Sequence, residues 1–394
     1  MAKKKIGGVI VSDLNHTNYG SFLQAYATMK TIQDLGYDLT FIKYKKQRSV
    51  FEKVFYGVQY LLSGGYEWKK RLIANNEMEK KNPEYKKGQD IRKCATNKLK
   101  EKVFVPYFKE YVGYKALCEG SKEFDACFVG SDQVWRPIGF YSNYWNLNFV
   151  DDSVPKFSYA SSYGVSSIPT IQKSGTKQYL NRLDMISVRE QNAKEIVESL
   201  SSKKALVVAD PTMLRTREQW ENFASNSTHE MPNEKYIFCY FLGIREDIRE
   251  EAKKLANNEN LKIVILRHMD EFVPADENLG DYAPYDIDAQ DFVKLLMNAE
   301  YVCTDSFHGT IFSILMHKKF ITFYRTKPTD RVSTHSRIDN LLSIFGLKNR
   351  LFNNNVMEIK KEIDFSHVDN VLENYRHISM DFLKTALSMT EKKD

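Results

Sequence analysis

Residues 3–42 of the 394-residue chain read KKKIGGVIVSDLNHTNYGSFLQAYATMKTIQDLGYDLTFI. The apolar run at residues 3–12 is bounded by charged and turn residues, and it predicts a buried strand. A polar loop follows, and apolar residues at helical spacing from Ser21 predict a helix that ends before Gly36. Residues 39–42 form a second predicted strand. This order predicts a right-handed βαβ unit with parallel strands.

The alternation of strands and helices continues beyond this unit. Short apolar runs each end in small or polar residues, as strands do when their carboxyl ends form a site. They predict strands at 126–129, 156–160, 185–188 and 205–209. After a polar stretch at residues 225–235, further strands are predicted at 236–242, 262–266, 301–304 and 320–324, with helices at 248–257, 289–298 and 309–317.

The pattern predicts an α/β protein with two domains, because 394 residues exceed the roughly 100–200 of one ordinary domain. We expect an N-terminal domain at residues 1–212, with a basic and aromatic insertion at 43–115, and a second domain at 213–365. Residues 366–394 place apolar side chains, including Ile378, on one face with Ser366 as the N-cap. They predict a C-terminal amphipathic helix.

Basic residues are concentrated in the N-terminal third. The formal net charge is +6, but residues 1–115 contain 23 Lys or Arg against 11 Asp or Glu, whereas residues 116–394 contain 34 against 40. Residues 43–109 contain 18 basic and 7 acidic side chains interleaved with aromatic ones, and regular α/β alternation is lost there. Such a segment suggests an anionic partner, which could be nucleic acid, a lipid surface or phosphate.

Cysteine usage and hydropathy favour a reducing compartment. The 5 cysteines are widely spaced without a Cys-x-x-Cys pair, so neither a disulfide framework nor a zinc site is expected. No run approaches about 18 apolar residues, which predicts a cytoplasmic protein without a transmembrane span. The motifs of P-loop ATPases, simple dinucleotide-dependent dehydrogenases, zinc proteases and α/β-hydrolases are missing, which counts against those classes.

The strongest local signal is TDSFHGT at residues 304–310. A predicted strand ends and a predicted helix begins there, so residues 308–310 are expected at a helix N-terminus, where an anion is favoured. In the functional interpretation an anion binds there and His308 donates a proton. In the structural interpretation Asp305 or Ser306 caps the helix and His308 is an ordinary loop residue. Local sequence leaves both open.

Other predicted strand ends also carry charged side chains. Asp132, in the stretch GSDQVW at residues 130–135, could take a proton from a hydroxyl or could cap a helix. Arg189 could bind a carboxylate or phosphate, or could pair with Glu190 or Asp184. For Asp210 a structural role is favoured. A basic cluster fits either a loop that closes over a phosphate or a solvated loop: Arg325, Lys327, Arg331 and Arg337 with His335.

Seven motifs follow one another along the chain. They are NYGSFLQAYA (18–27), VGSDQVW (129–135), SYASSYG (158–164), SVRE (187–190), DPT (210–212), TDSFHGT (304–310) and SRIDNLL (336–342). Together they resemble the polysaccharide pyruvyl transferase family, over residues 1–42 and about 124–350. The resemblance implies a GT-B-like fold, in which two Rossmann-like domains face each other across a cleft.

The resemblance also implies transfer of the pyruvyl group of phosphoenolpyruvate onto two hydroxyls of a sugar as a cyclic ketal, a scheme that requires no metal and no cofactor beyond this donor. We expect His308 as the proton donor and Asp132 as the base for the attacking hydroxyl. Expected donor contacts are Arg189, Ser306, Gly309, Thr310 and Arg337. Expected acceptor contacts are Asn18, Tyr19, Gln24, Ser161 and Tyr163.

Acceptors in the family are often glycans on a lipid carrier. An undecaprenyl-diphosphate-linked sugar lies at the inner membrane face, where the basic region 43–109 could hold the enzyme peripherally on the anionic surface. One predicted helical face fits either membrane contact or core packing: Phe51, Phe55, Val58 and Leu62, beside Lys69, Lys70 and Arg71. Nucleic acid is not an expected partner of the enzyme.

Two other functions compete with pyruvyl transfer. A GT-B glycosyltransferase that uses a nucleotide sugar would share the two-domain architecture and a donor pocket in the C-terminal half. A non-catalytic protein could instead bind nucleic acid or a membrane through residues 43–109. That function would leave the motifs around His308 and Arg189 without a purpose.

Overall fold

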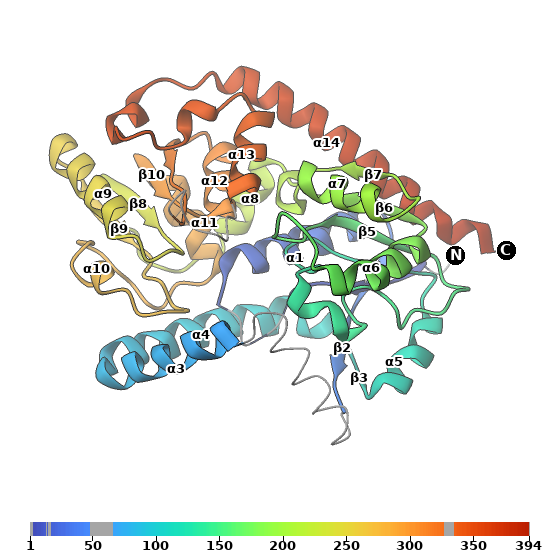
Figure 1. Cartoon of the computed structure of the whole chain (residues 1–394). Coiled ribbons are helices and arrows are strands. Elements are labelled where there is room, and N and C mark those ends of the chain that lie inside the picture. Colours follow the sequence, from blue (N-terminus) through green and yellow to red (C-terminus); the bar gives the residue numbers. More distant parts are fainter. Residues whose placement is uncertain (1–2, 13, 15–16, 48–65, 327–334, 394) are drawn as a thin grey trace.

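The computed structural model describes residues 3–12, 14, 17–47, 66–326 and 335–393. Two parallel sheets, each flanked by helices, form the two halves of the molecule (Figure 1). The α/β class with parallel sheets, expected from the alternation of apolar runs, is confirmed.

The first sheet has the strand order β3-β2-β1-β4-β5-β6-β7. Its strands are β1 (Lys5–Val9), β2 (Asp38–Lys45), β3 (Phe108–Val112), β4 (Ala126–Val129), β5 (Lys156–Ser161), β6 (Met185–Val188) and β7 (Ala205–Val207). β1 pairs in parallel with both β2 and β4, which confirms the parallel pairing predicted for the βαβ unit. The strand order reverses between β1 and β4, and open α/β sheets bind ligands beyond the carboxyl ends of strands at such a switch point.

Helix α1 (Tyr19–Asp34) follows β1 and begins two residues earlier than predicted. Its N-cap is Asn18, whose side-chain oxygen accepts the N–H of Ser21 at 3.3 Å. The helices that follow β3 in this half are α5 (Tyr114–Gly120), α6 (Thr170–Arg182) and α7 (Gln191–Leu200). Short 3-10 helices complete the chain: Val105–Tyr107, Ser121–Glu123, Pro137–Ser142, Pro211–Leu214, Lys348–Arg350, Val356–Lys360 and Met389–Lys393.

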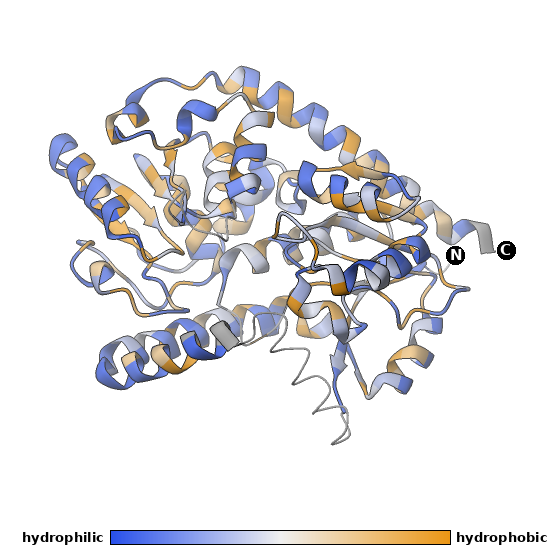
Figure 2. Cartoon of the chain, in the orientation of Figure 1, coloured by the Kyte–Doolittle hydropathy of each residue, from blue (hydrophilic) through white to orange (hydrophobic). Residues whose placement is uncertain are grey.

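The second sheet has the strand order β11-β10-β8-β9, again parallel, with its switch point between β8 and β10. Its strands are β8 (Tyr236–Tyr240), β9 (Lys262–Ile265), β10 (Tyr301–Thr304) and β11 (Lys319–Thr322). Figure 2 shows the central strands of this sheet as largely hydrophobic. The helices of this half are α8 (Arg217–Ala224), α9 (Glu246–Glu259), α10 (Pro274–Glu277), α11 (Ala289–Asn298), α12 (Phe307–Leu315) and α13 (His335–Ile344).

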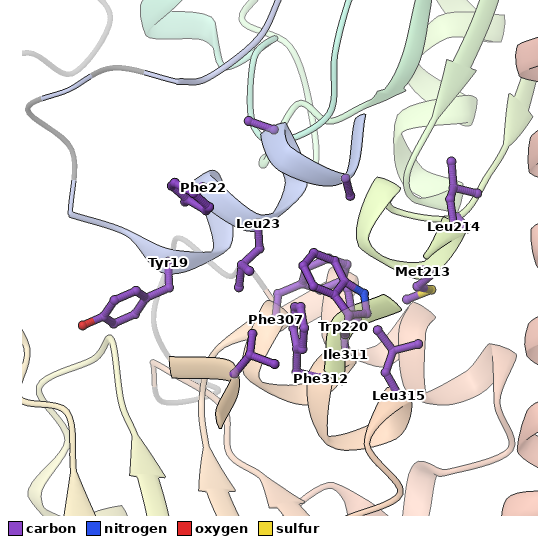
Figure 3. Close-up of a cluster of buried hydrophobic side chains, with 14 of the residues drawn as sticks. Tyr19, Phe22, Leu23, Met213, Leu214, Trp220, Phe307, Ile311, Phe312 and Leu315 are labelled. Carbon is purple, nitrogen blue, oxygen red and sulfur yellow. The ribbon is translucent and has the colours of Figure 1, made fainter. Parts of the chain in front are cut away.

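One hydrophobic core continues from the first sheet into the second. Helix α1 contacts α11 and α12, and Figure 3 shows Leu23 of α1 near Trp220 of α8 and Phe312 of α12. The rings of Trp220 and Phe312 lie 4.9 Å apart, and both belong to the same buried cluster as Leu23. Because the core is shared, the division into domains at residues 1–212, 213–365 and 366–394 stays a prediction.

The described part of the insertion is helical. Helix α3 (Tyr66–Lys81) and helix α4 (Pro83–Val103) form a hairpin without a strand between them, in agreement with the predicted loss of α/β alternation in 43–109. Arg92 of α4 is buried against the second half, where it donates to the carbonyls of Tyr285 at 2.7 Å and Pro284 at 2.9 Å. The predicted helical face from Phe51 to Leu62 lies outside the described residues.

The C-terminal helix α14 (Phe365–Ser388) crosses back to the first half, where Ser379 Oγ accepts the N–H of Ala209 at 2.8 Å (Figure 1). Its N-cap is Asp364, which accepts the N–H of His367 at 3.0 Å, so the prediction of Ser366 as the cap is wrong. Ile378 is exposed, contrary to the predicted face. Within the described part of the chain, no helix combines the length and apolar character that crossing a bilayer requires.

Candidate functional site

A polar cavity of about 310 Å³ lies where the switch points of the two sheets meet, and we call it the central cavity. Val11 follows β1 and Asp132 follows β4, while Leu242 follows β8 and Ser306 follows β10. The full lining is Val11, Asn18, Ser21, Asp132, Gln133, Arg136, Leu242, Asp270, Ser306, Phe307, His308, Arg325 and Arg337. Each half therefore contributes the loops in which open α/β sheets bind ligands.

The N-terminus of α12 forms one wall of the central cavity. Ser306 is the N-cap, and its hydroxyl accepts the N–H of Gly309 at 3.3 Å, as the structural interpretation predicted. The other predicted cap, Asp305, instead accepts the N–H groups of Leu242 at 2.6 Å and Gly243 at 2.8 Å. Among the described residues, the N–H groups of Phe307 and His308 have no partner. The helix end thus retains donors for an anion.

His308 is held between α1 and a buried carboxylate. Its Nε2 lies 3.6 Å from Oδ2 of Asp210. Its ring rests on Gly20 of α1, where an added Cβ would lie 2.1 Å from His308 Nδ1. No side chain fits at that distance, so Gly20 is required by the position of the imidazole. The helix that follows β1 thereby sets the place of a residue that follows β10.

Asp210 is buried and contacts several protein side chains, and it does not line the central cavity. Its carboxylate accepts the hydroxyls of Ser131 at 3.1 Å and Thr212 at 2.7 Å, and it pairs with Arg189 at 3.0 Å. Burial alone would raise the pKa of Asp210, but His308 and Arg189 outweigh it and hold the pKa far below the usual value. Asp210 is therefore a permanent anion behind His308, consistent with the structural role favoured from sequence.

Asp132 presents an ionised carboxylate to the central cavity. Its backbone is left-handed, with φ of 79°, and its carboxylate accepts Ser21 Oγ at 2.9 Å and the N–H of Gln133 at 2.8 Å. Burial would raise the pKa of Asp132, but Arg189, His308 and these hydrogen bonds together lower it. The next helix is the 3-10 helix Pro137–Ser142, whose N-cap is Arg136, so the alternative role of Asp132 as a helix cap is wrong.

Arg189 lies behind the cavity wall and does not line the cavity, although it was expected to contact the donor. Its guanidinium pairs with Asp210 at 3.0 Å and lies 3.8 Å from both Asp132 and Glu190. It also lies 4.5 Å from the ring centre of Phe307, and the cavity-lining Arg337 lies 5.8 Å from the same ring centre. The structure thus gives Arg189 carboxylate partners within the protein.

Arg337 does line the central cavity, and its charge lacks a carboxylate partner among the described residues. With the Gln133 amide oxygen turned towards it, both terminal nitrogens of Arg337 donate to that oxygen at 2.7 Å. Burial, together with Arg189 and Arg325, lowers the pKa of Arg337 to about 9. Arg325 also lines the cavity, 3.9 Å from Asp305. We call Arg325 and Arg337 the cationic wall. Two other residues of the predicted basic cluster, Lys327 and Arg331, lie outside the described residues.

The sequence profile of the family described as polysaccharide pyruvyl transferase matches residues 18–327. The chain belongs to this family. The matched range includes the cavity-lining loops after β4, β8 and β10, whereas Val11 and Arg337 of the cavity lining lie outside it. No curated protein sequence is a significant match.

Solved structures show the same fold at low sequence identity. UDP-N-acetylglucosamine 2-epimerase from Rickettsia bellii aligns with a TM-score of 0.52 and 11% identity, over 99% of this chain and 98% of that one. The Neisseria meningitidis enzyme, bound to UDP-GlcNAc, aligns with a TM-score of 0.50 and 11% identity, over 99% and 100%. These likenesses support the GT-B-like fold of this pyruvyl transferase family member.

Predicted contact residues divide into those at the cavity and those within the packing. Asn18 lines the central cavity, and Tyr19 lines a neighbouring cavity of about 20 Å³. Buried side chains with partners inside the protein, away from the central cavity, are Gln24 (Val11 and Ser21 carbonyls), Ser161 (Gly130 carbonyl), Tyr163 (Tyr179 hydroxyl) and Thr310 (Ser306 carbonyl). Gly309 is needed for packing, because an added Cβ would lie 2.5 Å from Thr304 Oγ1.

Several cavity residues were not predicted as site residues. Ser21, Gln133 and Phe307 lie inside the recognised motifs, so their neighbours could have drawn attention to them. Arg136 follows the second motif directly, whereas Asp270 lies in a loop without any recognised pattern. Among the described residues, no group of three or more His, Cys, Asp or Glu side chains could hold a metal ion.

Proposed function

We propose that this protein transfers the pyruvyl group of phosphoenolpyruvate onto two hydroxyls of a sugar, forming a cyclic ketal in surface polysaccharide biosynthesis. The observation that carries the proposal is Arg337, a buried guanidinium on the cavity wall that forms no ion pair with a carboxylate of the described residues. An anionic ligand would balance it, since buried charges require partners. Membership of the polysaccharide pyruvyl transferase family favours phosphoenolpyruvate as that ligand.

The two anionic groups of phosphoenolpyruvate have two sets of donors to bind. The cationic wall offers the guanidinium groups of Arg325 and Arg337, and the first turn of α12 offers the N–H groups of Phe307 and His308. Arg189 does not contact the ligand in this proposal and acts through its carboxylate partners. It holds Asp210 and Asp132, and those carboxylates in turn face His308 and the cavity.

His308 is the proposed acid for the donor. Asp210 faces Nε2, which leaves Nδ1 to exchange a proton with the ligand. Transfer of that proton to the methylene carbon of phosphoenolpyruvate creates the methyl group and leaves C2 cationic. A sugar hydroxyl then bonds to C2.

Asp132 is the proposed acceptor of the proton that this first hydroxyl loses. Its lowered pKa makes it a weak base, but the hydroxyl is strongly acidic once it has bonded to a cationic carbon, so a weak base suffices. The second hydroxyl bonds to C2 as the C2–O bond to phosphate breaks. One hydroxyl proton replaces the proton given by His308, and the other leaves with phosphate.

The acceptor is proposed to be a free or lipid-linked glycan. Helix α3 exposes Lys69 and Lys70 beside Leu72 and Ile73, a combination that supports peripheral contact with an anionic membrane. Replacing Lys69 and Lys70 by Glu is expected to reduce pelleting with phosphatidylglycerol vesicles at low salt. Unchanged pelleting would remove this part of the proposal.

The test of the reaction is incubation with phosphoenolpyruvate and a panel of free and undecaprenyl-diphosphate-linked glycans. We expect a pyruvylated glycan by mass spectrometry and one phosphate released per product. His308→Gln is expected to abolish both, while the matched control His377→Gln, on the exposed face of α14, leaves them unchanged. Turnover of a nucleotide sugar without any phosphoenolpyruvate-dependent product would instead establish a glycosyltransferase.

A further inference from the structure

Asp270 is a carboxylate at the junction of two cavities. It follows β9, and it lines both the central cavity and the neighbouring cavity of about 20 Å³, together with Asn18 and Leu242. Asp270 is exposed, and among the described residues its carboxylate has neither an ion pair nor a hydrogen-bond partner. Its oxygens are therefore available to a ligand.

The loop that carries Asp270 is fixed by the α3–α4 hairpin. Three consecutive carbonyls of this loop accept hydrogen bonds from the hairpin: His268 from Tyr85 at 3.1 Å, Met269 from Gln89 at 2.8 Å and Asp270 from Asn75 at 3.2 Å. Asn75 also accepts the N–H of Phe272 at 3.2 Å. Figure 1 shows α3 and α4 running beneath the part of the second half that carries α10. A segment inserted between β2 and β3 thus sets the position of a cavity residue that follows β9.

The central cavity is lined by charges of both signs. Arg325 and Arg337 attract an anion, whereas Asp270 repels the phosphate and carboxylate of phosphoenolpyruvate. A carboxylate accepts hydrogen bonds from hydroxyl groups, and its two oxygens can serve two hydroxyls at once. Asp270 therefore suits an uncharged molecule with several hydroxyls.

We propose that Asp270 binds hydroxyl groups of the acceptor sugar, and that the α3–α4 hairpin acts as an acceptor-specificity element by holding the Asp270 loop. This inference rests on the proposed function, and it places an acceptor contact in the second half of the molecule. Asn75 and Gln89 are positioning residues in this arrangement, since they reach the sugar only through the loop.

The experiment measures donor and acceptor binding separately. The dissociation constant of phosphoenolpyruvate is measured by calorimetry. The dissociation constants of the methyl glycosides of galactose, glucose and N-acetylmannosamine are measured by saturation-transfer NMR in the presence of phosphoenolpyruvate. Asp270→Asn is expected to weaken binding of the best glycoside about tenfold, because a hydrogen bond to a charged group is lost. Its affinity for phosphoenolpyruvate stays within about twofold of the wild type. The neighbouring Glu271→Gln, outside the cavity lining, is expected to change neither constant.

The hairpin is tested with a matched pair of variants on α3. Asn75→Ala removes the contact to Asp270, and it is expected to weaken glycoside binding about threefold; Asn76→Ala, at an exposed position, has no effect. The inference would be overturned if Asp270→Asn bound the glycoside with wild-type affinity. It would also be overturned if this variant lost as much affinity for phosphoenolpyruvate as for the glycoside. If the wild-type protein binds phosphoenolpyruvate but no glycoside, the inference about Asp270 is overturned and the proposed function is not. If the wild-type protein binds neither ligand, the proposed function is overturned as well.

Discussion

Arg189 and Arg337 both lie near Phe307, at 4.5 Å and 5.8 Å from its ring centre, yet their surroundings differ. Burial acts to lower the pKa of Arg189, but Asp210, Asp132 and Glu190 outweigh it and raise the pKa above its usual value. Burial and the neighbouring cations Arg189 and Arg325 lower the pKa of Arg337 to about 9. Three carboxylates lie within 3.8 Å of the first guanidinium, whereas the second forms no ion pair with any carboxylate of the described residues.

The same contrast separates the two halves of the molecule. The strand ends of the first sheet supply Asp132, Glu190 and Asp210, whose carboxylates all lie within 3.8 Å of the Arg189 guanidinium. Only its contact with Asp210 is a hydrogen bond, and Nε and Nη2 of Arg189 donate none. The second half supplies the cationic wall and the α12 amides, which retain free donors. A buried charge therefore indicates a ligand site only when its partners are missing. Residue type and burial alone would have assigned both arginines the same role.

The largest expected effect is the loss of stability in Arg189→Met. Removing one partner of a buried ion pair leaves uncompensated charge, here on Asp210 and Asp132, and typically costs about 3–5 kcal/mol of unfolding free energy. Urea denaturation would measure this loss. The matched control Arg217→Met removes an exposed pair with Glu221 and is expected to cost under about 0.5 kcal/mol. Equal stability of the two variants would contradict the structural role of Arg189.

Arg337→Met is expected to weaken ligand binding while sparing the fold. Loss of charge-assisted hydrogen bonds to an anion, at about 1.5–3 kcal/mol, corresponds to roughly 10- to 150-fold weaker phosphoenolpyruvate binding. Because an unbalanced buried charge is removed, the ligand-free melting temperature should not fall below that of the wild type. Thermal shift with and without phosphoenolpyruvate measures both quantities. A variant that unfolds like Arg189→Met would abolish the distinction between the two arginines.

Much of the fold could be predicted because buried parallel strands read as short apolar runs. The predicted strands 126–129, 185–188 and 301–304 coincide with β4, β6 and β10. Helix α4 could not be recognised in this way, because its buried side chains include Arg92, Thr96 and Lys100. Arg92 donates to backbone carbonyls nearly 200 positions away along the chain. Hydrophobic periodicity cannot predict such partners, because it reports only the apolar residues of the local segment.

The site was predictable only as far as local sequence determines it. The loops with His308 and Asp132 follow apolar strands, and polar residues after such strands predict a site. Whether a side chain faces the ligand depends on neighbours from other strands, and for this reason Arg189 and Tyr163 were expected at a contact but lie within the packing. Asp270 had no local signal, because its position depends on the distant hairpin α3–α4.

Gln133→Glu is the smallest and sharpest change, since it gives Arg337 the kind of partner that Arg189 already has. The Gln133 oxygen lies 2.7 Å from both terminal nitrogens of Arg337, so a carboxylate of the same shape would form a bidentate pair. Phosphoenolpyruvate must then compete with this carboxylate, and we expect its affinity to fall about tenfold, which corresponds to about 1.4 kcal/mol. The same charge compensates Arg337 in the ligand-free protein, so the melting temperature should rise, which distinguishes this variant from a misfolded one. Two results together would contradict this: an unchanged melting temperature of the ligand-free variant, and wild-type affinity for phosphoenolpyruvate. Arg337 would then not be an anion-binding residue, and the contrast with Arg189 would not hold.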